Sequence, residues 1–86
     1  MELSELGFQK IGMRGIKTRE GEELQEGDVI ETVQGTKFYC VNYFGLAPHI
    51  IDQQKKVYPL EEYMSPNIWK IGSLWDNPDL RIIFGL

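Results

Sequence analysis

The chain has 86 residues and a net charge of −4, with nine Lys and Arg against thirteen Asp and Glu. This length holds one small domain, residues 1–86, and excludes a deep cofactor pocket with its own walls, so we expect no cofactor. The acidic balance argues against a general nucleic-acid binder, which normally carries a basic excess to replace phosphate counterions.

The N-terminal part predicts short elements separated by glycines. Residues 2–7 could make one helical turn, which is too short to be stable without tertiary packing. Residues 8–11 and 16–18 are strand candidates broken by Gly12 and Gly15. Two further glycine turns are expected, at residues 20–22 and 26–28.

The middle of the chain predicts a hairpin. Residues 28–33 and 37–44 are strands, and the glycine-bearing segment 34–36 links them. Side chains of the second strand alternate between two faces, with Tyr39, Val41 and Tyr43 on one and Phe38, Cys40 and Phe44 on the other. Because both faces are apolar apart from Asn42, we expect a central strand.

The C-terminal part predicts two more strands. Residues 60–64, between two prolines, could make one helical turn. Residues 68–75 form a strand in which Gly72 suggests a bulge or bend. Residues 76–79 form a turn that leads into a closing strand at 81–84. Together, short strands at close spacing indicate an all-β fold, a small antiparallel barrel (Src-homology-3-like) of five or six strands with at most one helical turn.

The expected compartment is the cytoplasm. Acidic residues stand near the N-terminus where a signal peptide would be basic. No apolar run approaches the roughly 18 residues that a membrane span needs, so no membrane is expected. A single cysteine, Cys40, cannot form an internal disulfide, so the fold does not depend on oxidation.

Three segments, residues 15–24, 25–30 and 69–80, stand in an order that resembles the YopX-like family of small phage and prophage proteins. Family members pair a Gly-Leu-Lys-type segment with Glu-Gly-Asp followed by Ile or Val, and later carry Ile-Gly and then Asn-Pro-Glu/Asp-Leu. The similarity covers residues 15–33 and 68–80. It implies an all-β, phage-associated protein of unknown biochemical role, and it supplies no catalytic residues.

The sequence favours a protein that is not an enzyme. Cys40 and His49 are the only candidates for a nucleophile and its base, but Cys40 lies mid-strand, where a free cysteine is usually a buried hydrophobe, and His49 is expected in a loop. A dense acidic run lacks the ligand spacing of a calcium loop and predicts a solvated hairpin rim rather than a metal site: Glu20, Glu22, Glu23, Glu26, Asp28 and Glu31.

The aromatic residues carry the main functional hypothesis, a protein-binding module. They are too many for so small a core, so some must lie at the surface, either covering sheet edges or anchoring a protein interface. The interface candidates are Tyr39, Tyr43, Tyr58, Tyr63, Trp69 and Trp75. By analogy with the resemblance, inhibition of a host protein would suit such a gene.

Two alternatives stay open. A nucleic-acid binder could stack bases on exposed aromatics beside a basic cluster, which consists of Lys10, Arg14, Lys17 and Arg19. The neighbouring acidic run would repel the same phosphate backbone. A self-assembling structural protein could instead pair exposed strand edges between copies.

Overall fold

The computed structural model describes residues 3–9, 11–32, 38–44 and 47–86, with the backbone alone described for Leu6, Arg14, Phe44, Glu62, Tyr63 and Ser65. This part of the chain contains seven strands and three short helical segments. In chain order these are η1 (Leu3–Leu6), β1 (Gly12–Lys17), β2 (Glu23–Gln25), β3 (Asp28–Thr32), β4 (Phe38–Phe44), β5 (Ala47–Asp52), β6 (Val57–Pro59), η2 (Glu62–Asn67), β7 (Ile68–Ser73) and α1 (Asp79–Ile83).

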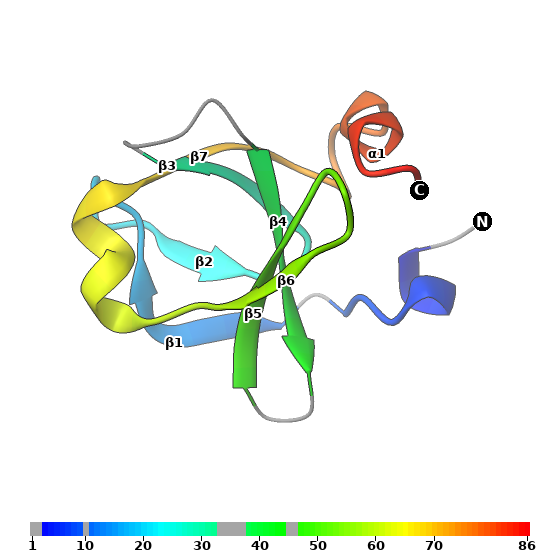
Figure 1. The fold of residues 1–86 in the computed structure, drawn as a ribbon. Coiled ribbons are helices and arrows are strands. Elements are labelled where there is room, and N and C mark those ends of the chain that lie inside the picture. The colour runs from blue at the N-terminus through cyan, green and yellow to red at the C-terminus, as the bar shows by residue number, and fades with distance from the viewer. Residues whose placement is uncertain (1–2, 10, 33–37, 45–46) are drawn as a thin grey trace.

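The strands form two antiparallel sheets. Five strands pair in the order β6-β5-β4-β3-β7, and β1 pairs with β2 in a separate two-stranded sheet. Figure 1 shows η2 on the same side of β4 as β1 and β2, with η1 and α1 on the opposite side. The predicted all-β antiparallel fold is confirmed, and β4 is the central strand. The described residues hold more short elements than expected, with seven strands and three helical segments.

The predicted pairing of β3 with β4 is confirmed, although the connecting residues 34–36 lie outside the described residues. Cys40 of β4 stands opposite Val29 of β3. On its other side β3 pairs with β7, where Val29 faces Gly72 and the next residue faces Lys70. One residue of β7, Ile71, is therefore extra, and this is the bulge that the neighbouring glycine predicts.

Two apolar clusters share the sheet as a common wall. The inner cluster fills the space between the two sheets, and its buried members are Met13, Ile16, Leu24, Ile30, Val41, Ile50, Leu60 and Ile68. The outer cluster lies on the other face of β3 and β4, and its buried members are Leu3, Phe8, Val29, Cys40, Leu74 and Phe84. This division confirms the predicted alternation of Tyr39, Val41 and Tyr43 against Phe38 and Cys40, while the side chain of Phe44 lies outside the described residues.

The turn between β2 and β3 ties several elements together. The Gly27 N–H donates to Val41 O at 2.8 Å, and its carbonyl accepts from Leu74 N at 2.7 Å. The indole Nε1 of Trp75 donates to Glu26 O at 2.9 Å. The glycine turns expected at residues 20–22 and 26–28 are confirmed, and both Gly21 and Gly27 have positive φ.

The strand predicted at residues 8–11 is wrong, since among the described residues of this segment none is in a strand. Phe8 is instead buried in the outer cluster, and the Gln9 N–H donates to Glu26 Oε2 at 3.0 Å. The strand of this region is β1, which runs through both glycines that were expected to interrupt it. Its register against β2 is irregular, and Gly15 accommodates this with a φ of 80°.

The closing strand predicted at residues 81–84 is also wrong, because these residues belong to α1 and the turn that follows it. Pro78 stands just before the helix with a φ of −57°, which suits a helical start. Leu80, Ile83 and Phe84 contact the outer cluster, whereas Ile82 is 78% exposed. That spacing follows the period of a helix rather than the alternation of a strand.

A strand appears where a loop was expected. His49 lies in β5, directly opposite Asn42 of β4, and the expectation of a loop at this histidine is wrong. Pro48 makes this strand hard to recognise in the sequence, because proline has no N–H to donate to a strand ladder. Its carbonyl nevertheless accepts from Leu60 N at 3.1 Å. A proline near the start of a strand is compatible with the ladder.

Candidate functional site

A cavity of about 350 Å³ opens between the five-stranded sheet and η2. Its lining is mostly aliphatic and aromatic, with hydroxyl and amide groups from a few polar residues. The lining residues are Ile30, Thr32, Tyr39, Ile50, Tyr58, Leu60, Met64, Asn67 and Ile68. β6 and β7 are the two edges of this sheet, and each contributes to the lining, β6 with Tyr58 and β7 with Ile68.

Two of the predicted interface residues, Tyr39 and Tyr58, meet at this cavity. Their rings contact edge to face, with centroids 6.2 Å apart and planes at 85°. Aromatic pairs favour this geometry because the positive ring edge meets the negative ring face. Tyr39 comes from β4 and Tyr58 from β6, so the pair spans the intervening strand β5.

The position of Tyr58 is fixed by the buried carboxylate of Asp52. The Tyr58 hydroxyl donates to Asp52 Oδ2 at 3.4 Å. The other oxygen, Oδ1, accepts from Gln54 N at 2.8 Å and from Lys56 N at 2.9 Å. The same carboxylate therefore holds the turn between β5 and β6 and orients one wall of the cavity.

The remaining walls come from β3, η2 and β7. Met64 is half-buried against the inner cluster, Ile68 is buried, and Asn67 is exposed. An apolar interior with a few polar groups is the usual lining of a ligand-binding pocket. The arrangement can accept one apolar group.

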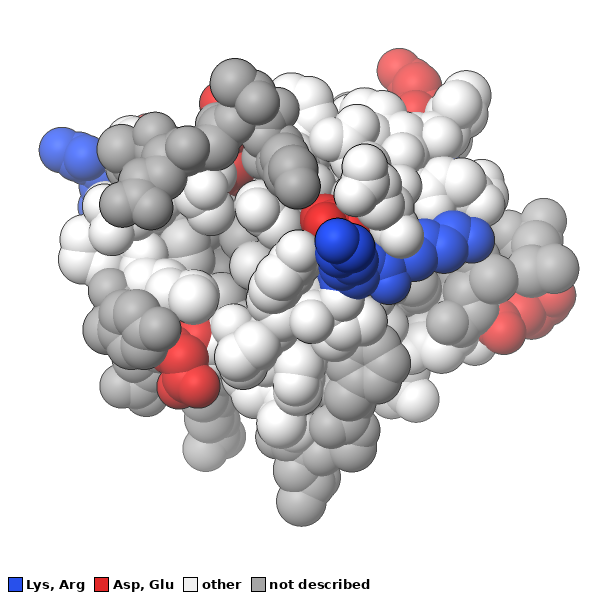
Figure 2. All heavy atoms as spheres, in the orientation of Figure 1, with Lys and Arg blue, Asp and Glu red and all other residues white. Residues whose placement is uncertain are grey.

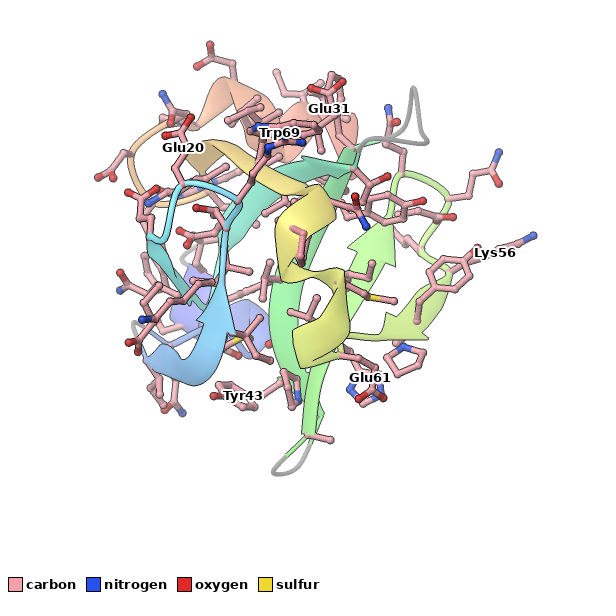
Figure 3. All side chains as sticks on the ribbon, turned by 90° about the vertical axis from the view of Figure 1, so that its left-hand side faces the viewer. Glu20, Glu31, Tyr43, Lys56, Glu61 and Trp69 are labelled. Atoms are coloured by element: carbon pink, nitrogen blue, oxygen red, sulfur yellow. The ribbon has the colours of Figure 1, made fainter. Side chains whose placement is uncertain are left out.

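The other predicted aromatic residues lie elsewhere. Tyr43 contacts the inner cluster, and its hydroxyl donates to Gly12 O at 3.4 Å. Trp75 is half-buried against the outer cluster. Trp69 is half-buried on β7, between Glu20 and Glu31 in the view of Figure 3. The side chain of Tyr63 lies outside the described residues.

The basic cluster is only partly described. Lys10 lies outside the described residues, as does the side chain of Arg14. Lys17 is exposed, and the Arg19 guanidinium lies over the Trp69 ring, 5.4 Å from its centroid. On the face shown in Figure 2, the charged side chains of the described residues stand in small separate groups.

Cys40 and His49, the candidate nucleophile and base, lie on the paired strands β4 and β5. Cys40 is 1% exposed, as expected of a core hydrophobe, and burial raises the pKa of its thiol to about 12. The thiol is therefore protonated at neutral pH and is a poor nucleophile. The Nδ1 atom of His49 lies 3.0 Å from Ala47 O, at the start of β5.

The acidic run is only partly a solvated rim, and two of its six carboxylates are buried. Glu26 is 3% exposed, and its oxygens accept from Gln9 N at 3.0 Å and Tyr43 N at 3.3 Å. Asp28 is 1% exposed and accepts from Gln25 N at 2.7 Å. These backbone hydrogen bonds compensate the burial that the sequence pattern did not reveal.

Asp28 also lies beside a second, more polar cavity of about 230 Å³. Its Oδ1 is 3.4 Å from the Lys70 ammonium. Burial raises the pKa of Asp28 above 3.8, and the hydrogen bond from Gln25 and the charge of Lys70 oppose that shift. Among the described residues, no group of three or more His, Cys, Asp or Glu side chains could hold a metal ion.

Sequence reasoning missed most of the cavity. Ile50, Leu60 and Met64 line it, yet they fall in the segment between the predicted strands where no element but one helical turn was expected. The sequence signal that could have indicated these residues is the spacing of Leu60 and Met64, which are four residues apart, as on one face of a helical turn.

Comparisons with family models, curated proteins and solved structures find no match for this chain. In the part of the chain that the structure describes, no helix has the length and apolar character to cross a membrane.

Proposed function

We propose that this domain is a non-enzymatic protein-binding module that takes an apolar side chain of a partner protein into the cavity between the sheet and η2. The observation that carries the proposal is the meeting of Tyr39 and Tyr58 in an apolar cavity of about 350 Å³. Tyrosines of this kind supply large contact area and dominate many protein interfaces. Moving a leucine side chain from water into such a site stabilises a complex by about 2 kcal/mol, or roughly thirtyfold in affinity.

The nucleic-acid alternative receives less support from the described residues. Arg19 covers one face of Trp69, so that face is not available to stack a base. Tyr39 and Tyr58 face each other and the cavity rather than forming a flat platform. Titration with single-stranded and duplex DNA and RNA at low salt tests this alternative, and salt-dependent binding would favour it over the protein interface.

The origin and biological role extend the same proposal. We propose that the gene belongs to a phage or prophage and that its product acts in the cytoplasm by inhibiting a host protein. This part of the proposal rests on the resemblance to the YopX-like family alone. The free, buried thiol of Cys40 is compatible with a reducing compartment.

Site-specific photo-crosslinking tests the binding function. The photoreactive amino acid p-benzoylphenylalanine is incorporated at Tyr58, in the cavity wall, and separately at Ile82, which is 78% exposed on α1. After irradiation in host lysate, we expect a discrete protein adduct from the first position and none from the second.

A blocking variant makes the test specific. Thr32→Trp places a large side chain in the cavity, whereas Gln54→Trp adds the same side chain at an exposed turn. We expect Thr32→Trp to abolish the adduct formed at Tyr58 and Gln54→Trp to leave it intact. Equal adducts from Tyr58 and Ile82, or an adduct that Thr32→Trp does not change, would contradict the proposal.

A further inference from the structure

The outer edge of β6 carries backbone groups without a strand partner among the described residues. β6 stands at one end of the five-stranded sheet, and the exposed residues Val57 and Tyr58 belong to it. The Asp52 N–H donates to Lys56 O at 2.9 Å, and the Leu60 N–H donates to Pro48 O at 3.1 Å. In an antiparallel ladder the hydrogen-bonded positions alternate. Tyr58 therefore bonds inward to β5, and the N–H and C=O of Val57 point outward.

This edge lies next to the cavity. Tyr58 stands opposite Ile50 in the ladder, and both line the cavity, so the cavity lies on their shared face of the sheet. Residues directly opposite each other on neighbouring strands project to the same face. A strand added to β6 would therefore place the side chain opposite Tyr58 on the cavity side.

The two ends of this edge carry opposite charges. Lys55 and Lys56 are exposed just before β6, and Glu61 is exposed shortly after it. Figure 3 shows Lys56 and Glu61 at opposite ends of β6. An extended segment that runs antiparallel to β6 has its N-terminal side near Glu61 and its C-terminal side near the lysines. Charge complementarity then selects basic residues on the N-terminal side and acidic residues on the C-terminal side.

We propose that the partner presents an extended segment that adds antiparallel to β6, inserts one aliphatic side chain into the cavity, and carries basic residues before that side chain and acidic residues after it. The inference rests on the proposed function and specifies its partner. Main-chain hydrogen bonds to Val57 would supply affinity, and the cavity and flanking charges would supply specificity.

Synthetic peptides test the segment directly. The probe has a central leucine with two lysines on its N-terminal side and two glutamates on its C-terminal side, and a second peptide exchanges these charges. By isothermal titration calorimetry we expect the first peptide to bind about fivefold more tightly, the size of effect expected for exposed ion pairs. The double variant Lys56→Glu and Glu61→Lys should reverse this preference.

Backbone methylation tests strand addition without altering the protein. The residue after the leucine would pair with Val57, so N-methylation there removes a hydrogen bond and should weaken binding about fivefold. N-methylation of the leucine itself is the matched control, because its N–H would point away from β6. Val57→Pro removes the outward N–H of the protein, with a thermal melt to check that the variant folds.

The outcomes separate this inference from the proposed function. If Thr32→Trp weakens peptide binding but methylation and charge exchange do not, the cavity binds an apolar group and strand addition is overturned. Absence of peptide binding overturns the inference, while crosslinking at Tyr58 decides the proposed function independently. A concentration-dependent dimer that Val57→Pro dissociates, without peptide binding, would assign the edge to a second copy of this chain and also overturn the inference.

Discussion

Gly27 is a position where a single methyl group should be costly. Its φ is 91°, in the region that side chains disfavour, and a Cβ there would lie 2.9 Å from Cδ1 of Trp75 and closer still to the indole nitrogen. Gly27→Ala therefore strains the backbone and displaces Trp75 from its hydrogen bond to Glu26 O. The two backbone hydrogen bonds of the turn, with Val41 O and Leu74 N, are made by Gly27 itself and depend on its backbone position.

The cost follows from these two effects. Left-handed backbone at a non-glycine residue costs about 1–2 kcal/mol. Loss of the buried indole hydrogen bond adds about 1 kcal/mol, or more where its donor remains unsatisfied. We expect Gly27→Ala to lower the free energy of unfolding by about 2–4 kcal/mol, which corresponds to a fall in Tm of at least about 8 °C for a domain of this size.

Urea unfolding followed by tryptophan fluorescence measures this change. The matched control is Gly21→Ala, because Gly21 has a φ of 86° but nothing within 4 Å of the position that the added methyl group would occupy. The control should lose only the backbone contribution, about 1–2 kcal/mol. In a Trp75→Phe background, which removes the indole nitrogen, Gly27→Ala should cost less than in the wild type. Equal losses for Gly21→Ala and Gly27→Ala would refute the reasoning.

Three further predictions concern stability. Glu26→Ala removes the side-chain acceptor of the Gln9 N–H and one of the two acceptors of the Tyr43 N–H, and should cost about 1–3 kcal/mol in urea unfolding, whereas the exposed Glu20→Ala should change little. Phe84→Ala should cost about 3–5 kcal/mol and Ile82→Ala less than about 0.5 kcal/mol; a larger effect at Ile82 would contradict helical packing of α1. Because burial raises the pKa of Cys40 from 9.0 to about 12, its protonated thiol contributes stability that is complete below pH 9 and lost as the pH rises toward 12. A pH series of urea midpoints should fall less steeply over that range for Cys40→Ala than for the wild type, and identical slopes would argue against the shift.

The sheet could be predicted where a strand is buried on both faces. β4 alternates large side chains on each side, and β3 precedes it across a short glycine-bearing segment, so their pairing followed from pattern alone. The C-terminal segment misled because three consecutive apolar residues, 82–84, fit a strand as well as a helix. The helix is distinguished from a strand by the solvent exposure of Ile82, which depends on tertiary packing and not on the local sequence.

The candidate site was harder to predict. Tyr39 and Tyr58 were both chosen as interface residues, but their meeting depends on β5 lying between them. That strand contains Pro48, which argues against a strand in a sequence, so no sequence pattern indicated it. Glu26 illustrates the same difficulty, since its burial depends on N–H groups supplied by Gln9 and Tyr43, each seventeen positions away.

The wall shared by the two apolar clusters has a consequence for recognition. Ile30 lines the cavity, while its neighbour Val29 is fully buried in the outer cluster, to which η1 contributes Leu3 and α1 contributes Leu80 and Ile83. Because Val29 is packed on the opposite face of β3, Ile30 cannot shift away from the cavity to make room for a larger side chain. A rigid receptor of this kind loses little entropy on association and should discriminate by size among aliphatic side chains.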